Sequence, residues 1–344
     1  MPAGTSSTGR IRLGIVGAGT HARKMLVPSL AYVDDLELVA MSSSSRQTAD
    51  RVEQAQGVKC HVGYEALLAD STVDAVVIAL PTGLHEPVGL AALKAGKHVL
   101  IESGYPKLLN TGVVDELRRR RDDGSKVLMF GNCELYMPIY EKLRELLERL
   151  RARIGPDEAL SVSMRYYWWP RYSQGAGIHH FLNLLLWLNG PVRKAWSIGT
   201  KRQIQGMLEY ANRDVGLFSG AEYDTPYLPM ERVEVLGKDS AITATNGYEL
   251  RYCDEIPPAA QSGHYRFDQA HETVWHPSFS LTYTVNTSLY LRGYVPELED
   301  FARCIRTGSK PRTDLDQIAA CQRLTHAVLA SMRQRGEPVS LAER

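Results

Sequence analysis

The stretch that decides the fold reads Ile11-Arg12-Leu13-Gly14-Ile15-Val16-Gly17-Ala18-Gly19-Thr20-His21-Ala22. Its first half is a short apolar run, which is typical of a buried strand. Its second half spells G-x-G-x-x-A and comes before a helix-like segment. This order of strand, glycine turn and helix predicts dinucleotide binding. Gly17 permits the tight turn, Gly19 lets the backbone approach a pyrophosphate, and Ala22 is small enough for close packing of helix on strand.

The residues that follow the turn complete this predicted cofactor site. Thr20 and His21 open the helix, and the first amides of a helix face bound phosphates. The sequence therefore predicts five cofactor-binding residues in this segment, namely Gly17, Gly19, Thr20, His21 and Ala22.

Length and composition predict a two-domain protein of the cell interior. At 344 residues, two domains are the default expectation. The 40 basic residues nearly balance the 39 acidic ones, so we expect neither nucleic acid nor an anionic membrane surface as a partner. The five cysteines are scattered and odd in number, which favours a reducing compartment. Residues 1–10 are small and polar, and we interpret them as a disordered leader of a cytoplasmic protein.

The first third of the chain alternates strand-like and helix-like segments. Strand-like runs cover residues 11–16, 36–41, 73–80, 97–101 and 126–130. Helix-like stretches cover about residues 22–31, 47–56, 86–95 and 111–121. Such alternation predicts a doubly wound α/β domain over residues 11–130, with a parallel sheet covered on both faces.

The remainder groups its strands together between helices. Helix-like stretches cover about residues 139–152, 179–188, 294–307 and 314–334. Strand-like pieces cover residues 159–169, 195–198, 230–236, 241–245, 249–252 and 279–285. This grouping predicts a second domain over residues 131–344, of the α+β class, with an open and mostly antiparallel sheet.

Several segments in this order resemble the glucose-fructose oxidoreductase and inositol dehydrogenase family, often called Gfo/Idh/MocA. They are the glycine turn, Ala79-Leu80-Pro81-Thr82-Gly83-Leu84-His85, Ala95-Gly96-Lys97-His98-Val99, residues 177–190, Glu297-Leu298-Glu299-Asp300-Phe301 and Ile305-Arg306-Thr307-Gly308. The resemblance covers nearly the whole chain. It implies a Rossmann domain followed by an open-sheet domain, with the substrate cleft between them.

The resemblance also implies partners and further site residues. A nicotinamide cofactor and a small-molecule substrate are expected, together with homodimers or homotetramers that associate through the open sheet. The family's cofactor-binding positions fall here on Leu80, Pro81, Thr82, His85 and Glu102.

The segment after the fourth strand departs from the family at its catalytic position. The family has Glu-Lys-Pro there, and the lysine exchanges a proton with the substrate beside the nicotinamide. In this chain Glu102 is followed by Ser103-Gly104-Tyr105-Pro106. Aligned from downstream, Tyr105 stands at the lysine position, as tyrosine does in biliverdin reductases, a branch of the family. A gapless alignment puts Ser103 there, and Lys107 beyond the proline is a third candidate.

The replacement of an amine by a phenol has a chemical consequence. A phenol with a pKa of about 10 is a good proton donor at neutral pH and a poor base. Tyr105 therefore favours reduction over alcohol oxidation. The alternative is that Tyr105 only fills space over the cofactor in a site that has lost its chemistry.

The second catalytic segment lies between residues 175 and 190. The family has Asp-x-Gly-x-His-x-x-Asp there, followed by a tryptophan. Anchoring on Trp187 puts His180 at the histidine, Asn183 at the second aspartate and Ala176 at the first, so one carboxylate is missing. The resemblance makes His180 a predicted catalytic residue and Asn183 a substrate contact on the same helix face, and the alternative is that His180 is an ordinary interior residue. His179, about 100° around the helix, is a second candidate contact. Two adjacent histidines on a helix do not point at one metal ion, so we expect no metal.

Aromatic residues and one arginine lie just before this segment, in Tyr166-Tyr167-Trp168-Trp169-Pro170-Arg171-Tyr172. Trp168 would stack on a flat ligand or on a sugar face, and Arg171 would bind a carboxylate or phosphate of the substrate. The alternative interpretation is that these aromatics pack in the core or cover a sheet face, and that Arg171 makes a surface ion pair.

The end of the second strand indicates the choice of nicotinamide cofactor. An NAD-preferring site has an acidic residue there to bind the ribose hydroxyls. This chain has Met41-Ser42-Ser43-Ser44-Ser45-Arg46 instead. Ser42 and Ser43 can bind a 2′-phosphate and Arg46 can neutralise it, so NADP(H) is favoured over NAD(H).

Two functional hypotheses follow. The first is an NAD(P)-dependent oxidoreductase, a reductase that moves hydride from NADPH to a sugar-derived ketone or to a conjugated or imine acceptor. Tyr105 or His180 then supplies the proton. The second is a redox-silent homologue that binds the cofactor as a sensor, a scaffold or a non-redox catalyst, which the loss of the lysine and of the carboxylate at Ala176 favours.

Overall fold

The computed structural model divides the chain into two compact units. It describes residues 9–103, 111–123, 126–167, 177–200, 202–221, 231–238, 240–253, 272–278 and 287–341. Unit 1 comprises Met1–Cys133 and Thr284–Ala319, and unit 2 comprises Glu134–Tyr283 and Ala320–Arg344. Throughout these described ranges, no helix is both long and apolar enough to cross a membrane.

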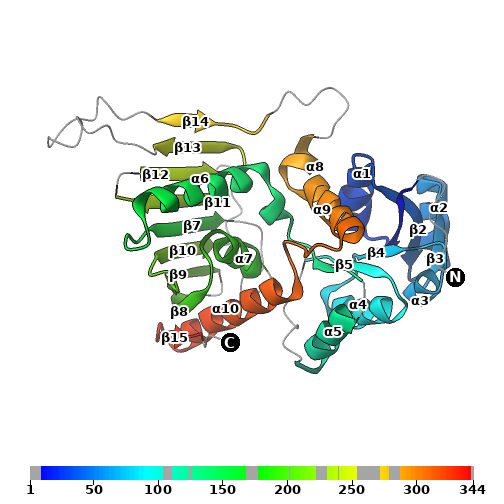
Figure 1. Ribbon diagram of the computed structural model, residues 1–344. Coiled ribbons are helices and arrows are strands. Elements are labelled where there is room, and N and C mark those ends of the chain that lie inside the picture. The colour runs from blue at the N-terminus through cyan, green and yellow to red at the C-terminus, as the bar shows by residue number, and fades with distance from the viewer. Residues whose placement is uncertain are drawn as a thin grey trace. The chain divides into compact units, whose positions relative to one another are not determined.

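Unit 1 is built on a six-stranded parallel sheet, which confirms the predicted fold class (Figure 1). Its strands are β1 (Ile11–Val16), β2 (Leu36–Ser43), β3 (Lys59–Val62), β4 (Ala75–Ile78), β5 (His98–Ile101) and β6 (Leu128–Phe130). Their order is β3-β2-β1-β4-β5-β6, so the direction of winding reverses between β1 and β4. In doubly wound sheets, ligands bind in the crevice outside the carboxyl ends of the strands at this switch point.

Helices pack against this sheet and enclose a continuous apolar core. They are η1 (Ala22–Leu26), α1 (Val27–Leu30), α2 (Arg46–Gln56), α3 (Tyr64–Leu68), η2 (Thr82–Leu84), α4 (His85–Lys94), α5 (Thr111–Asp123), α8 (Thr287–Leu291), α9 (Tyr294–Thr307) and the start of α10 (Leu315–Arg333). All four residues of β4 are buried, as its unbroken apolar run of Ala-Val-Val-Ile predicts for a central parallel strand. Leu117 of α5 and Phe130 of β6 belong to the same core cluster.

The helix after the glycine turn differs from the continuous α-helix expected over residues 22–31. Residues Ala22–Leu26 form a π-helix, and the α-helix begins only at Val27. Pro28 lies in the first turn of that α-helix and has no N–H to donate. A regular ladder of i→i−4 hydrogen bonds therefore cannot run through the segment.

The segment Thr284–Ala319 groups with unit 1, whereas the sequence pattern predicts it in the second domain of residues 131–344. Its helix α9 contacts α1. The Phe130 backbone N–H at the end of β6 donates to the carbonyl oxygen of Thr313 at 2.9 Å. Arg306 of α9 also pairs with Asp35 at 2.7 Å. Periodicity showed the helix at residues 294–307, but not that its contacts return to the first sheet.

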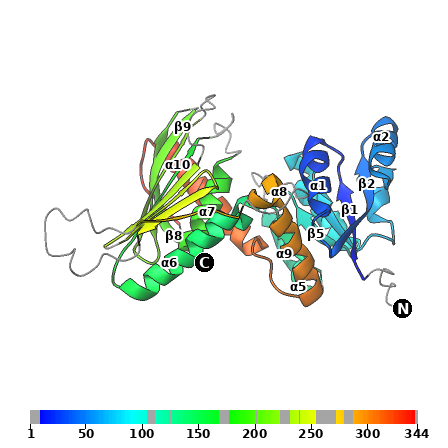
Figure 2. The same ribbon diagram turned by 90° about the horizontal axis from the view of Figure 1, so that it is seen from above.

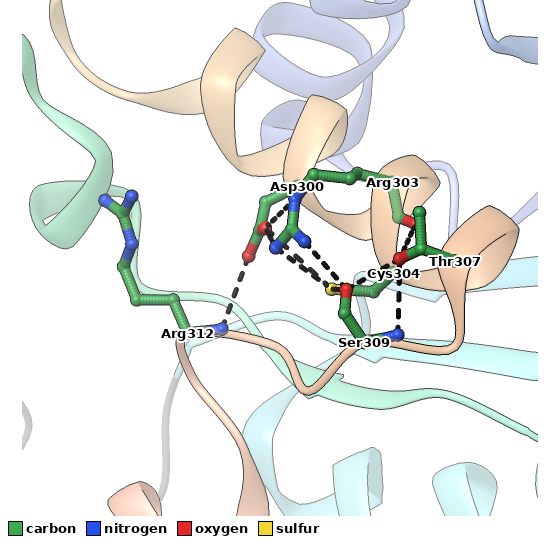
Figure 3. A network of polar contacts seen from close by, with 6 residues as sticks. All are labelled: Asp300, Arg303, Cys304, Thr307, Ser309 and Arg312. Atoms are coloured by element: carbon green, nitrogen blue, oxygen red, sulfur yellow. Dashed lines mark hydrogen bonds and ion pairs between the residues drawn. The ribbon is translucent and has the colours of Figure 1, made fainter.

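Polar contacts fasten the end of α9 to the loop that follows it (Figure 3). The Arg303 guanidinium pairs with Asp300 one helical turn earlier and donates to Ser309 Oγ at 2.7 Å. The same Asp300 carboxylate accepts the backbone N–H of Arg312 at 3.3 Å. These contacts set the path of the chain from α9 toward Thr313 and the edge of β6.

Unit 2 is built on a nine-stranded mixed sheet, and its mostly antiparallel pairing confirms the expectation. Its strands are β7 (Ser161–Tyr167), β8 (Val192–Gly199), β9 (Gln203–Tyr210), β10 (Val215–Ala221), β11 (Glu231–Gly237), β12 (Ser240–Thr245), β13 (Glu249–Cys253), β14 (Thr273–Trp275) and β15 (Val339–Ser340). The order is β14-β13-β12-β11-β7-β10-β9-β8-β15. Within this sheet, β7 and β10 run parallel and the other neighbours are antiparallel.

Helices of unit 2 lie on one face of this sheet (Figures 1 and 2). They are α6 (Pro138–Ile154), α7 (Ile178–Asn189) and most of α10, preceded by the short η3 (Cys133–Tyr136). Tyr166 points to this covered face and its ring lies 5.7 Å from that of Phe181. Tyr167 is only partly buried and lines the opposite face. Tyr166 therefore packs in the core and Tyr167 covers a sheet face, as the alternative interpretation of the aromatic segment expects for these two residues.

Two long strands of this sheet, β9 and β10, were not predicted. Both contain glycine, which weakens the strand signal of a sequence. The glycines have a packing reason. A Cβ atom at Gly206 would collide with the backbone of Trp196 and the ring of Phe218, and one at Gly216 would lie 2.5 Å from the carbonyl oxygen of Val162.

A buried polar network joins α6, α7 and the turn between β9 and β10. Its centre is Asp214, which is fully buried. Its carboxylate accepts the backbone N–H of Leu160 at 2.7 Å and the Asn212 amide at 3.0 Å. Arg151 of α6 donates to the same carboxylate and to Asn189 at the end of α7.

We predict that Asp214→Ala lowers the free energy of unfolding by about 3–5 kcal/mol, because it leaves the Arg151 charge and several donors without their acceptor. Urea denaturation followed by circular dichroism measures the change. Asp157→Ala is the control, because Asp157 is 94% exposed and 3.8 Å from Arg213, and its effect should stay within about 0.5 kcal/mol. Equal midpoints for Asp214→Ala and wild type would contradict a structural role of the network.

Candidate cofactor and proton-transfer site

The glycine turn ties the ends of three strands of unit 1 together. Gly17 has φ +107°, and a Cβ atom there would lie 2.5 Å from the carbonyl oxygen of Ala79. Its N–H donates to the carbonyl oxygen of Ser42 at the end of β2. Gly19 is exposed, and a Cβ atom there would meet nothing within 4 Å. The turn is thus closed toward the sheet and open toward solvent, which suits a backbone that receives a pyrophosphate.

The end of β2 presents serines and no carboxylate. Ser42 and Ser43 are buried, and Ser43 Oγ donates to the carbonyl oxygen of Ser45 at 2.7 Å. Ser45 is the N-cap of α2, where its side chain accepts the N–H of Thr48. Arg46 is 66% exposed and pairs with Asp50 at 2.7 Å, so it does not point at the serines. The expected phosphate-neutralising role requires Arg46 to leave this ion pair.

Residues 80–85 follow β4 at the same edge of the sheet. Leu80 and Thr82 are partly buried and Pro81 is exposed. His85 is buried at the start of α4, and its Nε2–H donates to the carbonyl oxygen of Leu80 at 2.6 Å. Because a carbonyl can only accept, this contact sets the donor nitrogen of the ring. Burial lowers the pKa of His85. The neutral ring holds the loop in place through its hydrogen bond to Leu80.

Glu102 and His21 face each other across this edge. Glu102 lies directly after β5, is 8% exposed, and its Oε2 lies 3.3 Å from His21 Nε2. Burial alone would lower the pKa of His21, but the Glu102 carboxylate outweighs it, and the net shift is upward. Within the described part of the chain, the buried Glu102 Oε1 has no hydrogen-bond donor. An unpaired buried acceptor suits a ligand hydroxyl, as the ribose of a nucleotide offers.

The predicted histidine of unit 2 lies in a buried polar pair. His180, near the start of α7, places its Nδ1 3.0 Å from Glu134 Oε2, and the two side chains are 15% and 13% exposed. Glu134 belongs to η3, at the beginning of unit 2. Burial alone would raise the pKa of Glu134, but His180 lowers it to about 2. The carboxylate is therefore ionised at every physiological pH.

The neighbours of His180 on α7 are buried as well. The His179 ring lies 4.2 Å from the His180 ring, centroid to centroid. The carbonyl oxygen of His179 accepts the thiol of Cys321 at 3.3 Å. Asn183 is fully buried one turn after His180. Both predicted substrate contacts thus lie beside the predicted proton donor.

Some predicted site residues lie outside the described residues. These are Tyr105, Trp168 and Arg171, and with them Lys107 and Ala176. Glu134, by contrast, was missed. It follows β6 in a segment without periodicity, 46 residues before His180, so no local pattern connects the two. Among the residues that are described, no group of three or more His, Cys, Asp or Glu side chains could hold a metal ion.

Comparison with known proteins agrees with this geometry. Residues 11–130 match the model of an oxidoreductase family with an NAD-binding Rossmann fold. A dTDP-3,4-didehydro-2,6-dideoxy-alpha-D-glucose 3-reductase of Streptomyces violaceoruber is 34% identical over 165 residues, which span about half (47%) of each protein. A D-xylose 1-dehydrogenase (NADP(+)) of Haloferax volcanii is 28% identical over 92% of this chain and 96% of its own length.

A solved structure extends the likeness in fold to both units. An oxidoreductase from Agrobacterium radiobacter, determined in complex with NAD+, L-tartaric acid and magnesium, has a TM-score of 0.79 at 14% identity. It covers 96% of this chain and 98% of its own.

The parallel sheet, the glycine turn and the polar residues at its carboxyl edge together define unit 1 as a dinucleotide-binding Rossmann domain. Unit 2 carries the open, mostly antiparallel sheet that accompanies it. Residues 11–130, which carry the glycine turn, match the Gfo/Idh/MocA family of oxidoreductases.

We predict that Glu102→Gln lowers the pKa of His21, because a neutral amide no longer stabilises the imidazolium. In the wild type the raised pKa means that the pair stabilises the fold below about pH 6.5, the unfolded value, and that this contribution is lost as pH rises through the folded value. Titration of His21 by ¹H–¹⁵N NMR measures it, with Asp50→Asn as the control on an unrelated ion pair. An unchanged His21 midpoint in Glu102→Gln would rule the interaction out.

Proposed function

We propose that the protein is a reductase that uses NADPH to reduce a sugar-derived ketone. The observation that carries the oxidoreductase class is the turn at Gly17 and Gly19, closed against the sheet and open to a ligand, with the unpaired Glu102 oxygen at the same edge. The substrate class and the direction rest on the relatives, one named as a reductase of a didehydro sugar and one as a sugar dehydrogenase.

The choice of NADP(H) rests on the end of β2. Ser42 and Ser43 stand where an acidic residue would repel a 2′-phosphate, and Arg46 at the start of α2 can turn from Asp50 to the phosphate. An exposed ion pair of this kind contributes little to stability, so exchanging Asp50 for a phosphate costs little. The relative from Haloferax volcanii carries NADP(+) in its name.

NADPH, when bound, supplies the hydride that reduces the carbonyl carbon. The chain's own contribution is a proton for the carbonyl oxygen and the placement of the substrate. We assign the proton to His180, with Tyr105 as the other candidate, and substrate contacts to His179 and Asn183 on α7 and to Trp168 and Arg171. Reduction of a conjugated or imine acceptor would likewise need a proton donor and side chains that place the substrate.

We predict that the purified protein binds NADPH more tightly than NADH and oxidises it in the presence of dTDP-3,4-didehydro-2,6-dideoxy-α-D-glucose. His180→Asn should lower kcat about 100-fold or more while the dissociation constant of NADPH stays the same, because only the proton source is lost. Fluorescence titration and absorbance at the nicotinamide band measure the two quantities. Tyr105→Phe is the comparison, and a larger loss in Tyr105→Phe than in His180→Asn would move the donor role to Tyr105.

The same activity assay is repeated with three further test substrates, namely D-xylose with NADP+, a cyclic imine and a conjugated enone. If the protein binds NADPH but turns over none of the test substrates, the result would contradict the reductase function and favour the redox-silent homologue. Absence of binding by either nicotinamide nucleotide would contradict both functions.

We also propose that a second copy of the chain covers the uncovered face of the nine-stranded sheet. Three large apolar side chains are more than half exposed there: Ile198 58%, Leu217 55% and Leu236 51%. They line a hollow of about 680 Å³ together with Arg165 and Glu234. Because this face carries both charges, two copies related by a two-fold axis can place Arg165 of each opposite Glu234 of the other. Apolar exposure of this kind marks an interface.

Leu217→Lys is expected to convert the oligomer to a monomer, because each copy would then bury an unpaired ammonium in the interface. Size-exclusion chromatography with light scattering measures the mass. Val62→Lys is the matched control, since Val62 is 46% exposed on β3 of unit 1 and lies on a different sheet. A wild-type mass of a single chain would contradict this proposal and leave the reductase proposal intact.

A further inference from the structure

The carboxylate that the family pattern places before the catalytic histidine is absent from this chain, where Ala176 stands in its position. The structure shows a carboxylate on His180 that comes from a different element. Glu134 Oε2 lies 3.0 Å from His180 Nδ1, and the two residues are 46 positions apart in the chain. The contact therefore does not follow from the spacing of residues on α7.

The surroundings of this pair make its charges matter. Both side chains are largely buried, so the attraction between a carboxylate and an imidazolium is screened less than at the surface. Beside the pair lies the titratable ring of His179, tilted by 32° against that of His180, and the Cys321 thiol bonds to the His179 carbonyl oxygen. Burial raises the pKa of the Cys321 thiol to about 12, so it stays neutral. Glu134 thus places a negative charge against His180.

We propose that Glu134 is the positioning residue of the reaction, and that it holds the His180 imidazolium in the orientation and charge state from which it gives up its proton. This role rests on the proposed reductase function. Glu134 would replace, from η3, the carboxylate that Ala176 cannot supply.

The carbonyl carbon receives hydride from NADPH, which leaves as NADP+, and the C=O bond becomes a C–O single bond. The carbonyl oxygen receives the proton of His180 Nε2, the nitrogen opposite the one that Glu134 holds. His180 ends as neutral imidazole, with its Nδ1–H still donated to Glu134, and recovers the proton from solvent. Glu134 remains ionised throughout, so it acts through His180 and not on the substrate.

A second histidine–carboxylate pair in the molecule provides a matched control. His61 Nε2 lies 3.0 Å from Asp70 Oδ2, and these side chains are 10% and 12% exposed. The distance equals that of His180 and Glu134 and the burial is similar, but His61 lies on β3, the edge strand of the sheet of unit 1. Asp70→Asn therefore removes a similar charge from a similar pair that has no part in the proposed chemistry.

The first arm of the experiment is an NMR titration of His180, which needs no substrate. His180→Asn assigns its signal. In the wild type we expect a midpoint above about 6.5, the value of an unperturbed histidine, and in Glu134→Gln a midpoint lower by about one unit or more. Asp70→Asn should leave the His180 midpoint unchanged. A wild-type midpoint below 6.5, or the same midpoint in Glu134→Gln, would overturn the proposal.

The second arm measures turnover of NADPH with dTDP-3,4-didehydro-2,6-dideoxy-α-D-glucose. Glu134→Gln should lower kcat about 100-fold with an unchanged dissociation constant for NADPH, and the alkaline limb of its pH profile should move to lower pH because the imidazolium is the active form. Glu134→Asp keeps the charge and should recover part of kcat. Asp70→Asn should match the wild type.

The outcomes separate the two proposals. Wild-type protein that reduces no acceptor would overturn the reductase function and, with it, the role of Glu134 in catalysis. Wild-type turnover that Glu134→Gln retains would overturn the role of Glu134 alone. If Glu134→Gln does not fold, the wild-type midpoint and the partial recovery in Glu134→Asp decide the question.

Discussion

The close approach of backbone at Gly17 is the constraint on which the site of unit 1 depends. Gly17 has φ +107°, and the carbonyl oxygen of Ala79 lies where the Cβ atom of another residue would be. Any other residue at this position would therefore have to displace the chain at the end of β4. Gly17 also binds the end of β2 through its N–H. The turn therefore fixes where β1, β2 and β4 end relative to one another. Ser42 and Leu80 owe their places around the turn to that arrangement, and Glu102 follows β5, which pairs with β4.

Much of unit 1 could be predicted from the sequence because its central strands are buried on both faces. Such strands are apolar runs between turns, and their positions at β1, β4 and β5 agree with expectation to within a few residues. Unit 2 was harder to predict because its sheet has one uncovered face, and glycines such as Gly206 serve packing between strands. The division into units was harder still, because the contact of Phe130 with Thr313 joins residues far apart in the chain.

The candidate site shows the same distinction between local and distant information. Gly17, Ser42 and His180 could be proposed from the sequence because each belongs to a short motif whose spacing reflects one turn, one strand end or one helix face. Arg46 was predicted to bind the 2′-phosphate because it follows the serines in the sequence. In the structure its guanidinium pairs with the carboxylate of Asp50 instead. Glu134 carries no such motif. Its position beside His180 is a result of how η3 and α7 pack, and packing of this kind is visible only in three dimensions.

The pair of Glu134 and His180 also bears on the choice between an enzyme and a redox-silent homologue. Burying two ionisable groups costs desolvation, and two apolar residues of similar volume would stabilise the same site as well or better. Stability alone therefore gives no reason for an ion pair at this place. A proton donor that must be charged at neutral pH does give one, because an imidazole buried without a carboxylate loses its proton. The missing carboxylate at Ala176 was one of two supports for the redox-silent homologue, beside the loss of the lysine, and a carboxylate supplied by η3 answers that one support.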